Sequence, residues 1–175
     1  MNATTTLTDP PLAGDEIATL RGFLDYQRDV MRRKTEGLTE TQLNQARPPS
    51  TMTLGGMLKH LALVEIDWLT GVFHNRPIGE PWQGVDWEAD RDWDWHSAVH
   101  DSPEQLRRLL DVAIAEADRG IDEALASGGL DAMSAKPDGE RFSLRWIVVH
   151  LIEEYARHLG HADLLRESID GSVGD

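Results

Sequence analysis

Residues 143–168 carry the longest helical pattern of the chain, and this segment constrains the fold most. It reads SLRWIVVHLIEEYARHLGHADLLRES and holds three of the seven histidines. At about 100° per residue, His150, Glu154, His158 and His161 fall within roughly 80° of one another on a helical wheel. Apolar residues lie beside this arc, so the polar row borders a face that should be buried. Because burying such groups without a partner is costly, we expect them to bind something, and all four are metal-capable.

Three further segments show the apolar spacing of amphipathic helices. They cover residues 14–37, 53–74 and 102–128, and Thr53 and Ser102 are good N-caps for the second and third. No segment is rich in β-forming residues. Together with the C-terminal helix, they predict an all-α fold, a four-helix bundle in one domain. The first two connections are long enough to cross the bundle, so the order of the helices stays open.

The connection between the second and third helices is long and rich in tryptophan. Residues 75–101 contain Trp82, Trp87, Trp93 and Trp95. A connection of this length inside a compact domain is usually functional or disordered, and the tryptophan content argues against disorder. The tryptophans form either a packed lid over the bundle or the aromatic wall of a pocket, and the two interpretations are compatible.

Length and composition predict one domain and exclude several classes of protein. We expect a flexible N-terminus at residues 1–13, a single domain at 14–170 and a short tail at 171–175. The net charge of −14 disfavours nucleic acid as a partner. No apolar run reaches membrane-spanning length and the start does not resemble a signal peptide, so we expect a cytoplasmic protein. The absence of cysteine excludes disulfides and thiolate ligands, which leaves His, Asp and Glu to hold any metal.

A three-ligand metal site is the leading interpretation of the polar row. Glu154 and His158 are four residues apart, so their side chains can reach one cation from the same helix face. His60 lies on the core side of the second helix and can supply a third ligand; alternatively it is a core histidine bonded to a carbonyl. Three protein ligands with an open position are typical of catalytic zinc. His96 and His100 are also four apart, but we expect both to be exposed.

Four other side chains are candidates for the pocket or for contact with a ligand. His150 can be a fourth ligand, a partner of a ligand or a core histidine, and Asp67 can orient a ligand. Trp68 lies on the same helix side as His60. Arg157 either anchors an anionic substrate or forms an ordinary ion pair with Glu153.

Two segments carry a resemblance to a known family. TLGGMLKHLALVEIDWL, which includes His60, and EEYARHLGHADLLRE, which includes Glu154 and His158, resemble the DinB/YfiT superfamily of metalloenzymes over residues 15–170. The resemblance implies a four-helix bundle in which these three residues hold a divalent metal. Many members have histidine as the first residue of the pair. The variant with glutamate is similar to the actinobacterial branch with mycothiol-dependent maleylpyruvate isomerase and the mycothiol S-transferases.

The resemblance also implies a chemistry. Zinc or nickel would be the metal, a low-molecular-weight thiol the co-substrate and a small electrophile the substrate, with S-transfer or isomerisation as the reaction. Coordination of a thiol to a metal deprotonates it, and we predict His161 as the proton carrier. A metal-dependent hydrolase and a non-catalytic metal-binding bundle are the alternatives. Relatives often dimerise, so a homodimer is the candidate assembly.

Overall fold

The computed structural model describes residues 7–135 and 139–174, and this part of the chain contains helices and no β-strand. The prediction of an all-α fold is therefore confirmed. The α-helices are α1 (Glu16–Thr35), α2 (Glu40–Leu43), α3 (Leu54–Ile66), α4 (Trp93–Ser97), α5 (Pro103–Gly128) and α6 (Leu144–Asp170). A π-helical segment, η1 (Asp67–Phe73), continues α3, and two single 3₁₀ turns, η2 (Ala98–His100) and η3 (Gly129–Asp131), follow α4 and α5.

Side-chain caps fix the starts of the long helices. The hydroxyls of Thr53, Ser102 and Ser143 each accept a hydrogen bond from a backbone N–H in the first turn of α3, α5 and α6. Such a cap satisfies a donor that the helix itself cannot pair. At the other end of α6, Gly171 adopts a left-handed conformation with φ of 79°, which glycine reaches without strain. The caps predicted at Thr53 and Ser102 are confirmed.

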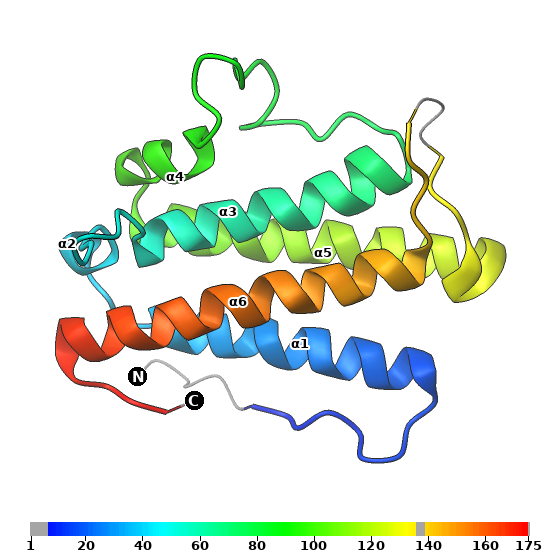
Figure 1. Cartoon of the computed structure of the whole chain (residues 1–175), viewed down its shortest axis with the longest axis horizontal. Coiled ribbons are helices and arrows are strands. Elements are labelled where there is room, and N and C mark those ends of the chain that lie inside the picture. The colour runs from blue at the N-terminus through cyan, green and yellow to red at the C-terminus, as the bar shows by residue number, and fades with distance from the viewer. Residues whose placement is uncertain (1–6, 136–138, 175) are drawn as a thin grey trace.

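The four long helices pack as two pairs (Figure 1). Helix α3 packs along α5, and α1 packs along α6. Within each pair the helices run in the same direction: Arg145 at the start of α6 contacts Glu16 at the start of α1, and Lys34 contacts Asp163 near the opposite ends. Because α3 and α5 also run in the same direction, the segment between them must return along the length of the molecule, and it passes over α3.

Helix α3 is the most buried element, and one of its charged residues holds α4 in place. Lys59 is almost fully buried, forms an ion pair with Asp101, and lies 4.7 Å from the ring centroid of Trp93. A desolvated cation gains from both contacts. The segment from Trp93 to Asp101 is thereby fixed beside the N-terminal half of α3.

The first six residues of the N-terminus predicted to be flexible lie outside the described residues. Of the remainder, Leu7 packs against the core and Leu12 is exposed. No helix in the described residues is long and apolar enough to cross a bilayer.

Candidate functional site

Helices α3 and α6 bring His60, Glu154 and His158 together at one point. Each offers a ligand atom, and these atoms lie within 4.8 Å of one another. Glu154 Oε2 is 3.5 Å from His158 Nε2 and 3.9 Å from His60 Nε2. Both distances are too long for a hydrogen bond, so the three groups face one another without bonding.

The surroundings of the two rings suit them to binding a cation. His60 Nδ1 is bonded to Asp94 Oδ2 at 2.7 Å, so Nε2 is the ring nitrogen that faces Glu154. Burial, aided by the nearby His60 and His161, lowers the pKa of His158 to about 4, so this ring is neutral near pH 7. A neutral imidazole and a carboxylate are the forms in which these side chains bind metals.

The spacing fits a divalent cation. Ligands at about 2.1 Å from a tetrahedral zinc ion lie roughly 3.4 Å from one another. The distances of 3.5 and 3.9 Å from Glu154 Oε2 to the two histidine nitrogens are close to this value. Two nitrogens and one oxygen form a donor set that zinc and nickel accept, and three ligands leave a position open.

Helix α4 supplies two residues to the site that the sequence did not assign individually. Asp94 is almost fully buried, and its carboxylate is hydrogen-bonded to His60 Nδ1. A carboxylate is a usual partner for the second ring nitrogen of a metal-binding histidine. Trp95 stacks on His60 at 4.9 Å between ring centroids and lies 5.5 Å from His158. It therefore covers both imidazoles. The only signal in the sequence is the run DWDWH, which alternates acidic and aromatic residues inside a connection.

A pocket of about 400 Å³ opens beside His60. Its walls combine apolar and aromatic side chains with charged ones. Trp82, by contrast, is buried in the core, so the tryptophans of this connection both pack the domain and line a pocket. The residues of the wall include Leu63, Asp67, Ile78, Trp87, Arg91 and Trp95.

His161 lies one turn beyond His158, and their ring centroids are 5.9 Å apart. Its Nδ1 is buried and has no hydrogen-bond partner. The ring lines a smaller pocket with Arg47, Met52 and Leu165 rather than the pocket beside His60. Its role as proton carrier stays a prediction.

Of the other predicted residues, His150 lies beside Glu154. His150 Nε2 lies 3.6 Å from Glu154 Oε1, whereas His158 Nε2 is nearest to Glu154 Oε2. His150 and His158 therefore approach different oxygens of the Glu154 carboxylate. The His150 ring stacks on Trp146 and meets the edge of Trp68. Arg157 is exposed and forms an ion pair with Glu153, which was one of the two interpretations given for it from the sequence.

Three of the sequence candidates, Asp67, His96 and His100, lie away from the three convergent atoms. Asp67 lines the pocket, but Asp94 is the carboxylate bonded to His60 Nδ1. His96 and His100 are exposed, and His96 pairs with Asp90. A second group of potential ligands, His150 with Glu153 and Glu154, shares Glu154 with the first group and includes the exposed, paired Glu153.

Comparison with known proteins identifies the family of the chain. No curated protein matches the chain. A family model described as mycothiol-S-transferase matches residues 19–171, which include α3, α4 and α6 and therefore all the groups at the site. The resemblance seen in the sequence is thus confirmed, and the chain belongs to the mycothiol S-transferase family.

Proposed function

We propose that the protein is a metal-dependent thiol S-transferase with the four-helix bundle of the DinB type. A divalent cation, zinc or nickel, would be held by His60, Glu154 and His158. One observation carries this proposal: three metal-capable atoms from two helices converge, unpaired with one another, at the spacing of a coordination shell. Family membership supports a small thiol as co-substrate.

The residues of this chain would divide the work of the site. Asp94 fixes the tautomer and the direction of His60. Trp95 excludes water from one side of the two imidazoles. The pocket beside His60 has room for a small molecule and presents apolar rings to it.

The chain has no cysteine, so a reactive sulfur must come from a co-substrate. A divalent cation held by His60, Glu154 and His158 would lower the pKa of that thiol. The sulfur forms a bond to an electrophilic carbon of the substrate. A leaving group departs with the electron pair of the broken bond. We propose that His161, one turn from His158, accepts the thiol proton.

Metal analysis of purified protein tests the proposal. Wild-type protein offered zinc or nickel and then desalted should retain stoichiometric metal, and His60→Ala and Glu154→Ala should not. Glu153→Ala is the matched control, because Glu153 is the neighbouring glutamate but is exposed and paired with Arg157. It should retain metal as the wild type does. Wild-type protein without bound metal would refute the metal site.

Thiol consumption separates the transferase from the alternatives. The metal-loaded protein is incubated with mycothiol and a generic electrophile such as a haloalkyl-substituted dye. Conjugate formation above the background of Glu154→Ala is expected. Stoichiometric metal without any conjugation would favour a hydrolase or a non-catalytic protein.

A further inference from the structure

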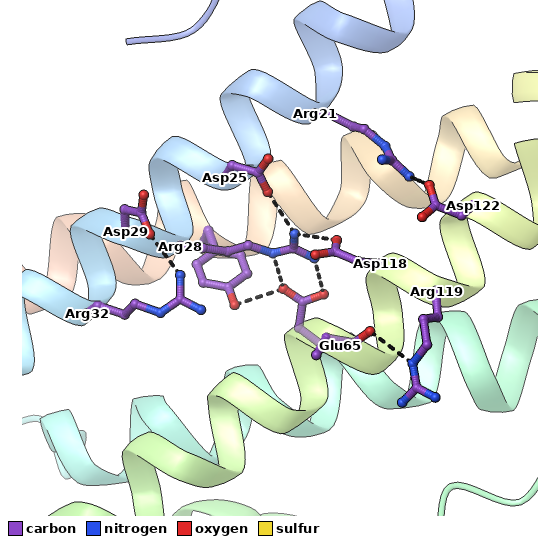
Figure 2. Close-up of polar contacts among 11 residues, drawn as sticks. Arg21, Asp25, Arg28, Asp29, Arg32, Glu65, Asp118, Arg119 and Asp122 are labelled. Atoms are coloured by element: carbon purple, nitrogen blue, oxygen red, sulfur yellow. Dashed lines mark hydrogen bonds and ion pairs between the residues drawn. The ribbon is translucent and has the colours of Figure 1, made fainter. Parts of the chain in front are cut away.

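A buried ionic cluster lies between the helices (Figure 2). Arg28 of α1 is 1% exposed, and its Nε and Nη2 donate to the two carboxylate oxygens of Glu65, each at 2.7 Å. Glu65 of α3 is fully buried. Arg28 Nη1 donates in addition to Asp25 of α1 and Asp118 of α5. The cluster therefore joins three of the four long helices.

Tyr155 adds the fourth helix. Its hydroxyl donates to Glu65 Oε1 at 2.9 Å, and its side chain is fully buried. Tyr155 directly follows Glu154 on α6, while Glu65 lies five residues after His60 on α3. The Tyr155–Glu65 hydrogen bond thus connects the two helices that bear the proposed ligands, within a turn or two of those ligands.

The two donors of the cluster, Arg28 and Tyr155, keep their protons. Burial lowers the pKa of Arg28, but the charge of Glu65 and the hydrogen bonds to it raise this pKa by more, to well above its usual value. Burial, reinforced by the charge of Glu65, raises the pKa of Tyr155. Arg28 is therefore charged and the tyrosine hydroxyl keeps the proton that it donates.

Such a cluster is poorly explained by stability alone. Desolvating an ion pair offsets most of its attraction, and apolar side chains of similar volume stabilise a core as well or better. The best-attested use of buried polar groups is to fix the register of helices. Register matters here, because a shift of α6 by one residue would move Glu154 by about 1.5 Å along the axis and about 100° around it.

We propose that Arg28, Glu65 and Tyr155 set the register of α6 against α3, and thereby hold Glu154 and His158 at the distance from His60 that metal binding requires. This inference rests on the proposed metal site. Glu65 and Tyr155 are positioning residues, since their side chains act through the two helices and not on a ligand. The hydrogen bond between them is the direct link.

Tyr155→Phe tests the link because it removes only the hydroxyl. The ring still fills the core, and Glu65 keeps both hydrogen bonds to Arg28, so the variant should fold. We expect it to bind Co²⁺ about tenfold more weakly than the wild type, a loss no larger than that of a partner bonded directly to a ligand. The visible absorption of the bound Co²⁺, which reports coordination geometry, should also change.

Thr35→Val is the matched control. Thr35 is fully buried as well, but its hydroxyl donates to carbonyls of its own helix, at Met31 and Arg32. It should lower thermal stability to a similar extent and leave Co²⁺ affinity and absorption unchanged. If wild-type protein binds Co²⁺ and Tyr155→Phe matches it in affinity and spectrum, the positioning role is refuted while the metal site stands. Wild-type protein that binds no Co²⁺ would refute both.

Discussion

Replacing Asp94 by alanine should weaken metal binding while leaving the fold intact. The Asp94 side chain is 4% exposed and accepts a 2.7 Å hydrogen bond from His60 Nδ1. Without it, the imidazole can rotate and can carry its proton on either nitrogen, so Nε2 is no longer reserved for a metal. Lys59 and Asp101 still hold α4 against α3 in this variant.

The size of the effect follows from the two roles of the carboxylate. Loss of an outer-sphere partner typically costs 10- to 100-fold in metal affinity. Asp94→Ala removes both the orientation and the charge, so we expect the upper end, about 100-fold or roughly 2.7 kcal/mol. Asp94→Asn keeps an oxygen acceptor for Nδ1–H and loses only the charge, so we expect about tenfold, or roughly 1.4 kcal/mol.

Competition with a chromophoric chelator near neutral pH measures these affinities. Asp90→Ala is a close control, because Asp90 also accepts from a histidine Nδ1, that of the exposed His96, at 2.9 Å, but away from the proposed metal site. It should bind metal as the wild type does. An Asp94→Ala protein within about twofold of the wild type, or an equal loss in Asp90→Ala, would contradict the assignment of Asp94 to His60.

Two further predictions concern pH and the surface. The pKa of His158 is lowered from 6.5 to about 4, chiefly by burial, so between these values the unfolded chain binds a proton that the folded protein does not. The free energy of unfolding of the metal-free protein should therefore be at its full value above pH 6.5 and fall by about 3 kcal/mol as the pH is lowered to 4. Chemical denaturation at several pH values should show this dependence in the wild type. The same dependence in His158→Gln would contradict the prediction. Arg157→Ala removes an exposed ion pair with Glu153 and should change stability by less than about 0.5 kcal/mol in thermal denaturation. It should also leave conjugation rates unchanged for neutral and anionic electrophiles, and a selective loss with anionic ones would instead make Arg157 a substrate anchor.

Features encoded within a few neighbouring residues were predictable from the sequence. The caps at Thr53, Ser102 and Ser143 depend on one side chain and the next turn of backbone, so residue type and spacing suffice. The pairing of Glu154 with His158 likewise depends only on helix geometry. His60 required more, namely the assumption that two amphipathic helices pack with their polar positions facing one another.

Features that depend on the path of the chain were not predictable. Asp94 meets His60 only because the connection returns across α3, and no local pattern sets that path. The segment Asp67–Phe73 is π-helical, so a helical wheel drawn at 100° per residue no longer predicts which of its side chains point to the core. Glu65 reads as a solvated charge on an amphipathic helix, yet Arg28, far away in sequence, pairs with it in the core.

The parallel arrangement of α3 and α5 has a consequence for how this site can vary. If α3 were joined to an antiparallel helix by a short turn, no connecting segment would return along α3 to reach His60. Here the returning connection brings Asp94 and Trp95 to the ligands, while its earlier part contributes pocket residues such as Ile78 and Trp87. Insertions or substitutions in residues 79–90 can therefore reshape what the pocket admits while the helices that bear the ligands stay fixed. His60 and Asp94 belong both to this pocket and to the proposed metal site, so we expect changes at Trp87 to alter what the pocket admits with less effect on metal binding than changes at His60 or Asp94.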